Sequence, residues 1–159
     1  MRIAAGSDHA GYHLKRMLVA YLVDLGHDVT DLGTGDAEVS VDYPEYGEAV
    51  GRAVANGDAD LGICACGTGM GIAMAANKVA GVRAAVVHDV TTATLAREHN
   101  HANVLCLGGR TVGPTTAVDA LVAFLAATPQ HGRHDRRIEE LAALDRAAGR
   151  TAGAVGLAP

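Results

Sequence analysis

The stretch Leu61-Gly62-Ile63-Cys64-Ala65, followed directly by Cys66-Gly67-Thr68-Gly69-Met70-Gly71, decides the fold class of this chain. The short apolar run predicts a buried strand, and the glycines after it predict a tight turn. The small residues from Gly71 to Asn77 then predict a helix. A strand, a glycine-rich turn and a helix in this order are typical of an α/β domain with a parallel sheet.

The same alternation of apolar runs and helical patterns continues outward from this stretch in both directions. The predicted strands cover residues 2–6, 28–32, 61–65, 83–87 and 104–107. The predicted helices cover the apolar stripe from Leu14 to Leu25, residues 45–56, 71–77 and 90–99, the stripe from Val118 to Leu125, and residues 133–147. We therefore predict one α/β domain over residues 1–147, with a five-stranded parallel sheet covered on both faces. Residues 148–159 read as a Gly- and Ala-rich tail that is mobile or lies on a partner subunit.

Composition excludes several classes of protein. Of the 159 residues, 49% are hydrophobic and 19% are charged, and the net charge is -5. No basic footprint for nucleic acid or an acidic membrane surface is present, so a bound anion must be held by a local site. We expect neither a cleavable signal nor a membrane span. Three cysteines, an odd number, favour a reducing compartment, and we expect the cytoplasm.

Ligands of open parallel sheets bind beyond the carboxyl ends of the strands. We expect polar residues from four separate segments to meet at this edge. They are Asp8 and His9, the turn from Cys66 to Gly71, His99 and Asn100, and Arg110.

The glycine turn has the composition of an anion-binding nest, because small residues let successive backbone N–H groups approach a ligand. Its spacing is G-x-G-x-G, and Ile72 stands where a dinucleotide fingerprint needs its last glycine. No Walker lysine follows, so we expect no nucleotide cofactor. A tight turn without chemistry is an equal alternative at this point.

Cys66 stands at the start of the predicted helix, where a thiolate is stabilised and can act as a general base or nucleophile. Cys64 and Cys106 read as buried structural cysteines. A zinc site on Cys64 and Cys66 would lack a second cysteine pair, so no metal is predicted.

Outside the turn, a histidine and two arginines are further candidates. His99 could exchange protons near neutral pH, although a surface histidine is the alternative. Arg133 and Arg137 are spaced i, i+4 and share one helix face, and arginine forks match phosphate oxygens. A solvated basic face is the alternative, above all for His134 and Arg136.

Taken together, the motifs resemble one family over nearly the whole chain: ribose-5-phosphate isomerase type B, grouped with the galactose-6-phosphate isomerase subunits. The motifs are Ser7-Asp8-His9-Ala10-Gly11, Asp42-Tyr43-Pro44, Cys66-Gly67-Thr68-Gly69-Met70-Gly71, Ala75-Ala76-Asn77-Lys78, Arg97-Glu98-His99-Asn100, Gly108-Gly109-Arg110 and Gly132-Arg133-His134. The resemblance implies a Rossmann-like three-layer α/β/α fold and a homodimer or tetramer whose active site is shared between subunits. It also implies an aldose–ketose isomerisation of a phosphorylated sugar without metal or cofactor.

The resemblance also implies residue roles. Cys66 would be the base that moves a proton between C1 and C2, and His99 would assist ring opening together with Asp8. Thr68 and the backbone of Gly67, Gly69, Met70 and Gly71 would hold the enediolate. The phosphate would be bound by His9, Arg110, Arg133 and Arg137, some of them from the neighbouring subunit. The sugar would be bound by Tyr43 and Asn100. One family branch uses a glutamate further along the turn, at the position of Ile72 here, so this chain resembles the cysteine branch.

Three functional hypotheses follow. The first is an isomerase for ribose 5-phosphate and ribulose 5-phosphate. The second keeps this chemistry but acts on erythrulose 4-phosphate and erythrose 4-phosphate of a polyol pathway, or on a hexose 6-phosphate. We expect the loop from Gly33 to Tyr43 and the reach of the C-terminal arginines to set the chain length. The third is a non-catalytic sugar-phosphate sensor, which predicts loss of Cys66 or His99, yet both are present.

Overall fold

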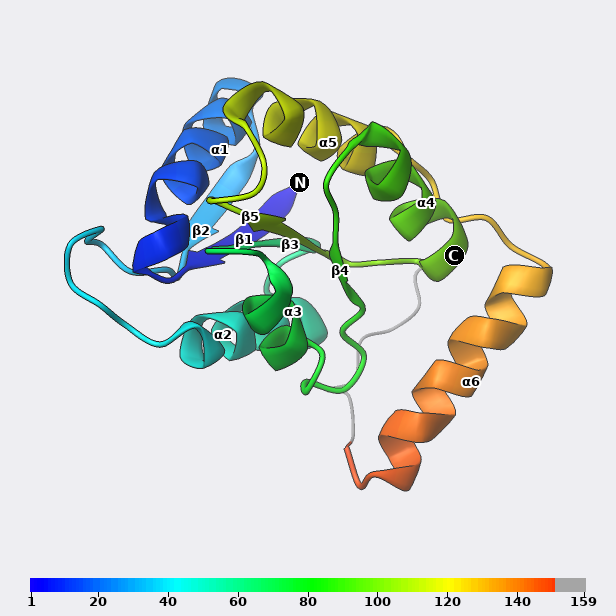
Figure 1. The fold of residues 1–159 in the computed structure, drawn as a ribbon. Coiled ribbons are helices and arrows are strands. Elements are labelled where there is room, and N and C mark those ends of the chain that lie inside the picture. The colour runs from blue at the N-terminus through cyan, green and yellow to red at the C-terminus, as the bar shows by residue number, and fades with distance from the viewer. Residues whose placement is uncertain (151–159) are drawn as a thin grey trace.

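A five-stranded parallel sheet runs through the middle of the computed structural model, which describes residues 1–150 (Figure 1). The strands are β1 (Arg2–Ser7), β2 (Asp28–Asp31), β3 (Leu61–Cys66), β4 (Ala84–Val86) and β5 (Val104–Gly108). Their order is β2-β1-β3-β5-β4, and every neighbouring pair is parallel. The predicted five-stranded parallel sheet is confirmed. All the carboxyl ends therefore lie at one edge of the sheet, which we call the carboxyl edge.

Helices cover both faces of this sheet. They are α1 (Tyr12–Asp24), α2 (Tyr43–Ala55), α3 (Met70–Ala76), α4 (Val90–Asn100), α5 (Pro114–Ala126) and α6 (Arg133–Ala147). Figure 1 shows α1, α4 and α5 on one face and α2 and α3 on the other, which confirms the three-layer arrangement. The sequence did not predict the 3-10 helix η1 (His9–Gly11), because three residues are too few to show a period.

The hydrophobic core consists of two clusters, one on each face of the sheet. The cluster under α1, α4 and α5 contains large side chains, among them Leu18, Leu22, Leu105, Leu121 and Phe124. The cluster under α2 and α3 is built from smaller ones, among them Val50, Cys64, Ile72, Ala76 and Cys106. Small side chains let α2 and α3 lie close to the strands, and this closeness fixes the backbone around the glycine turn.

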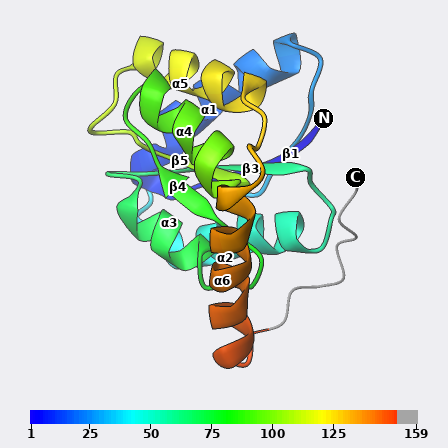
Figure 2. The same cartoon turned by 90° about the vertical axis from the view of Figure 1, so that its right-hand side faces the viewer.

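The last helix, α6, extends away from the three layers (Figures 1 and 2). The segment just before α6 is joined to α4 by a hydrogen bond from the Gln130 backbone N–H to the Glu98 carbonyl oxygen, 2.8 Å. Leu141 and Leu144 on α6 are exposed. Most of the predicted tail over 148–159 lies outside the described residues. Within residues 1–150, no helix has both the length and the apolar character needed to span a bilayer.

Candidate active site

Cys66 is the last residue of β3, and its side chain lies at the base of the glycine turn, with the residue only 4% exposed. The backbone N–H of Gly69 donates a hydrogen bond to the Cys66 Sγ at 3.2 Å. A donor aimed at the sulfur stabilises negative charge on it. This contact holds the Cys66 sulfur in place at the start of α3, a helix of only seven residues.

Glycine is required in the turn because two backbone segments approach each other closely there. Gly69 has a φ of +79°, and a Cβ on it would lie 2.9 Å from the carbonyl carbon of Leu107. A Cβ on Gly108 would lie 2.7 Å from the carbonyl carbon of Thr68. The end of β5 and the glycine turn therefore touch through their main chains, and a side chain at either glycine would separate them.

Backbone hydrogen bonds join the same two segments. The Gly109 N–H donates to the Cys66 carbonyl oxygen at 2.8 Å, and the Arg110 N–H donates to the Gly67 carbonyl oxygen at 2.9 Å. The Arg110 side chain lies over Gly67, where a Cβ would meet its Nη1 at 3.4 Å. The structure thus brings Arg110 to the turn, as predicted, with its guanidinium beside the turn backbone.

Thr68, Met70 and Gly71 form the outer part of the turn. The Thr68 hydroxyl accepts the Met70 N–H at 3.3 Å, and both residues are exposed. Tyr43, at the start of α2, covers this region, because a Cβ on Gly71 would lie 2.6 Å from its ring atom Cζ. The predicted sugar-binding residue Tyr43 is therefore adjacent to the turn.

Asp8 and His9 follow β1 at the same edge. The buried Asp8 carboxylate caps η1 by accepting the Gly11 N–H at 2.9 Å. A Cβ on Gly11 would lie 2.3 Å from the carbonyl of Ala65, so η1 is pressed against the end of β3. The His9 Nδ1 lies 3.2 Å from both the backbone nitrogen and the carbonyl oxygen of Val41. Asp8 and His9 are thus brought to the turn as predicted.

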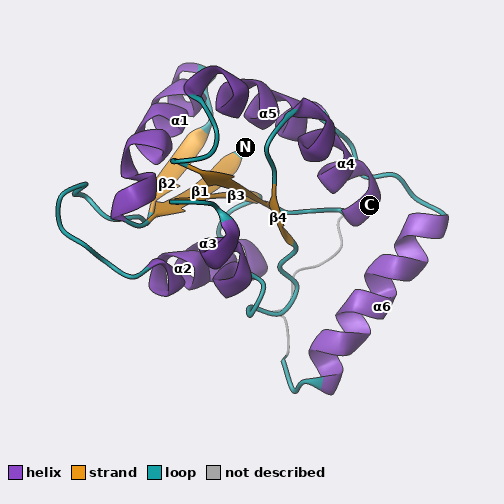
Figure 3. Ribbon diagram, viewed as in Figure 1, coloured by secondary structure: helices purple, strands orange, loops and turns teal. Residues whose placement is uncertain are grey.

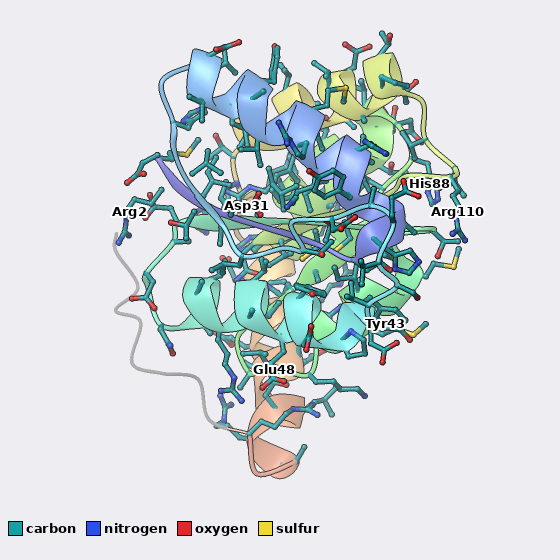
Figure 4. The ribbon with its side chains drawn as sticks, turned by 90° about the vertical axis from the view of Figure 1, so that its left-hand side faces the viewer. Arg2, Asp31, Tyr43, Glu48, His88 and Arg110 are labelled. Atoms are coloured by element: carbon teal, nitrogen blue, oxygen red, sulfur yellow. The ribbon has the colours of Figure 1, made fainter. Side chains whose placement is uncertain are left out.

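Figure 4 shows this edge from the side, with Tyr43, His88 and Arg110 at one end of the sheet and Arg2 at the other. We call the residues gathered here the carboxyl-edge cluster. Its members are Asp8, His9, Tyr43, Arg110 and the turn from Cys66 to Gly71.

The expectation that His99 and Asn100 lie at this edge is wrong. The helix α4 connects two parallel strands, so it runs back across the sheet and ends at Asn100, just before β5 begins at Val104. The residues before a strand lie at its amino end. The strand β5 separates the two edges by about 13 Å, from a rise of about 3.3 Å per residue. Within one chain, His99 and Cys66 are therefore at opposite ends of the sheet.

His99 has neighbours of its own at this amino edge. Its ring stacks on the ring of His134, with centroids 4.5 Å apart and planes 10° from parallel. The Arg133 Nε lies 3.3 Å from the His134 Nε2, and Arg137 follows one turn later on α6. Asn100 lines a largely apolar groove of about 420 Å³ between α6 and β4. We call His99, Asn100, Arg133, His134 and Arg137 the amino-edge cluster.

The interpretation of His134 as part of a solvated basic face is wrong. The residue is 4% exposed because its ring lies under His99. Burial lowers the pKa of His134, and the neighbouring His99, Arg133 and Arg137 lower it further. Its neutral form is favoured, which suits a ring that stacks on another imidazole.

The other two cysteines differ from Cys66. Cys64 and Cys106 are fully buried and face each other on β3 and β5. A hydrogen bond with Cys64 and complete burial raise the pKa of the Cys106 thiol well above its ordinary value. This thiol stays protonated, in agreement with its predicted structural role.

Sequence reasoning missed three residues near the carboxyl edge. His88 is exposed just after β4, and its position after a strand is the same signal that pointed to Asp8. Tyr46 on α2 has a raised pKa, through burial and the nearby carboxylates of Glu45 and Asp8. Lys15 is buried in the first helix, where its position gave no sign of a role beyond the helix surface.

Comparisons with known proteins agree with this architecture. The family model described as Ribose/Galactose Isomerase matches residues 3–141. The chain is 46% identical to the ribose-5-phosphate isomerase B of Escherichia coli K12 over 144 residues, which are 91% of this chain and 96% of that protein.

Two solved structures are also similar. The Clostridium thermocellum ribose-5-phosphate isomerase B has a TM-score of 0.91 at 47% identity, covering 93% of this chain and 99% of that one. The Mycoplasma genitalium ribose-5-phosphate isomerase B with bound ribulose-5-phosphate has a TM-score of 0.87 at 42% identity, covering 91% of this chain and 96% of that one.

Proposed function

Because the chain belongs to the ribose/galactose isomerase family, we propose that it is the isomerase that interconverts ribose 5-phosphate and ribulose 5-phosphate. The observation that carries this proposal is the contact between the Gly69 N–H and the Cys66 Sγ at the end of β3. This contact fixes the Cys66 sulfur beside the backbone N–H groups of the turn, where a cysteine can act as a general base.

In the proposed reaction, the Cys66 thiolate removes the proton from C2 of the open-chain aldose and returns it at C1. The hydroxyl proton on O2 moves to O1, so atoms and charge balance. Negative charge develops on these oxygens in the enediolate, where the N–H groups between Gly67 and Gly71 and the Thr68 hydroxyl can meet it. One well-placed donor lowers such a barrier by about 3 kcal/mol. The tight main-chain packing of the turn supports this role, since these donors need no rearrangement.

Ring opening must come before the proton transfer at C2. It needs a proton taken from the O1 hydroxyl and one delivered to the ring oxygen. We assign this exchange to His99, assisted by the Asp8 carboxylate, and the phosphate to His9, Arg110, Arg133 and Arg137. Tyr43 and Asn100 are assigned to the sugar. Binding of the phosphate, far from C1 and C2, supplies free energy that orients the reacting carbons.

These assignments use both clusters, so the proposed site takes residues from two chains. The amino-edge cluster of one chain would face the carboxyl-edge cluster of another in a homodimer or tetramer. Two features support this arrangement: the distance of about 13 Å along β5 between the edges, and the apolar groove beside Asn100. A second copy covering the groove and the exposed Leu141 and Leu144 of α6 would remove apolar surface from water.

The three cysteines support a reducing compartment, and we propose the cytoplasm. In the described part of the chain all three are free and buried. This is the ordinary state of cysteines in a reducing environment.

A panel of four-, five- and six-carbon sugar phosphates tests the activity. We expect ribose 5-phosphate to give the highest kcat/KM, and solvent deuterium to appear in the product through exchange at the base. Turnover of none of the sugars would contradict the isomerase assignment. A higher kcat/KM for a tetrose or hexose phosphate would change the assigned substrate and leave the assigned isomerisation unchanged.

A further inference from the structure

Lys15 carries a charge into the interior, and the mechanism above does not use it. The residue is 1% exposed, which is rare for lysine unless a partner compensates the charge. Its Nζ donates to both carboxylate oxygens of Asp31 at 2.8 Å and to the Thr34 carbonyl oxygen at 2.9 Å. All three ammonium protons therefore have acceptors, and all three acceptors belong to the chain at and just beyond the end of β2.

These bonds fix the first residues of the long loop between β2 and α2. The Gly33 N–H donates to the Asp31 carboxylate at 3.0 Å, and the Thr34 N–H donates to the Ser7 carbonyl oxygen at 2.9 Å. The loop start therefore lies beside Ser7, the residue directly before Asp8. The Lys15–Asp31 pair thus acts together with backbone bonds to β1 in placing the start of the loop at the edge that holds the proposed base.

The other end of this loop also meets the carboxyl-edge cluster. Val41 contacts the His9 Nδ1 through its backbone, and Tyr43 covers Gly71 two residues later. Between its two ends the loop extends away from the domain (Figure 3), and most of residues 35–40 are exposed. Its position thus depends on its ends, one held by Lys15 and the other in contact with His9.

We propose that Lys15 and Asp31 are positioning residues for the sugar phosphate, because they fix the 33–42 loop that holds His9 and Tyr43 at the site. The proposal rests on the proposed function. Only the lysine end of the pair is buried, since the Asp31 side chain is 40% exposed, so the buried ammonium depends on acceptors at the start of the loop. A lysine ammonium can join a carboxylate and a main-chain carbonyl at once, which an apolar side chain cannot do.

The first test is the double variant Lys15→Met/Asp31→Asn, which removes both charges and keeps an acceptor for the Gly33 N–H. We expect KM for ribose 5-phosphate to rise about tenfold or more, with a much smaller change in kcat, because small misplacements of binding groups are costly. A melting temperature close to that of the wild type shows that the variant is folded. A folded double variant with wild-type KM would overturn the proposal.

A control variant addresses the loss of an ion pair as such. Arg2→Met breaks the ion pair with Asp60 at the start of β1, at the opposite edge of the sheet. We expect it to leave KM and kcat unchanged. An equal rise of KM in this control would show that any lost ion pair has the same effect, and would also overturn the proposal.

Two glycines of the loop give a second test that keeps every charge. A Cβ on Gly33 would lie 2.5 Å from the Ser7 nitrogen and 3.0 Å from the Lys15 Nζ, whereas a Cβ on Gly35 would meet nothing within 4 Å. We expect Gly33→Ala to raise KM, as the double variant does, and Gly35→Ala to keep the wild-type KM. Equal kinetics for the two glycine variants would contradict the proposal.

The assays also separate this proposal from the proposed function. If the wild type does not turn over ribose 5-phosphate, the function is wrong. If the wild type is active and the variants keep its KM, the function stands and the positioning role is wrong.

Discussion

The two edges of the sheet hold their candidate residues in different ways. At the carboxyl edge, main chain packs on main chain: Gly69 lies against Leu107 with no room for a Cβ, and the Gly109 N–H donates to the Cys66 carbonyl oxygen. At the amino edge, side chains pack on side chains. The ring of His99, near the end of α4, stacks on that of His134 at the start of α6, the helix that extends away from the domain (Figure 2).

This difference matches the two tasks of the proposed reaction. Stabilising an enediolate needs donors that are already in place when charge develops, and a backbone held by glycine contacts provides them. Ring opening and phosphate binding use residues of both edges in this proposal, and the amino-edge share, His99, Arg133 and Arg137, consists of side chains that can reach a substrate held by a second chain. The following predictions test this division, beginning with the largest expected effect.

Loss of the base should have the largest effect. We expect Cys66→Ala to lower kcat at least a hundredfold, in line with the usual contribution of a general base, while substrate still binds. Steady-state kinetics and calorimetric titration measure the two quantities. Cys106→Ala is the matched control, because it removes a buried thiol from the neighbouring strand. An unchanged kcat in Cys66→Ala would remove this residue from the mechanism.

A smaller effect is expected from the amino edge. Arg137→Ala should raise KM for ribose 5-phosphate about tenfold, with less change in kcat, because one charge-assisted contact to phosphate is lost. The neighbouring Arg136 is the control, since its exposed side chain pairs with Glu140 at 3.7 Å and Arg136→Ala should bind substrate normally. If the two alanine variants have the same KM, the assignment of Arg137 to the phosphate is wrong.

The smallest expected effect is on the pH dependence of the melting temperature, through His134 at the start of α6. The pKa of His134 is lowered in the folded protein, so the unfolded chain takes up its proton first as the pH falls. The stability contributed by the neutral, stacked ring is present above the ordinary histidine pKa of about 6.5 and is lost as the pH falls from there through the lowered folded value. We expect the melting temperature of His134→Gln to depend less on pH than that of the wild type in this window. Parallel slopes would contradict the role of His134.

Much of the fold was predictable because strands and helices leave periods in the sequence. The turn at Cys66 was predictable because its glycines follow an apolar strand. The placement of His99 was not, because a motif before a strand and a motif after one look alike until the direction of the connecting helix is considered. Lys15 was missed, and His134 was interpreted as a solvated residue, for a different reason. Their burial depends on partners distant in the sequence, Asp31 and His99, and a lysine on a helix looks like a surface residue.

The central claim is that the two edges form one site only when two chains meet. Co-expression of Cys66→Ala with His99→Ala tests it, because each variant lacks one essential residue. In a dimer with random pairing, half of the dimers are mixed, and each mixed dimer has one site that is intact at both positions. We therefore predict about a quarter of the wild-type activity from the mixture and almost none from either variant alone. A mixture no more active than the single variants would contradict the shared site.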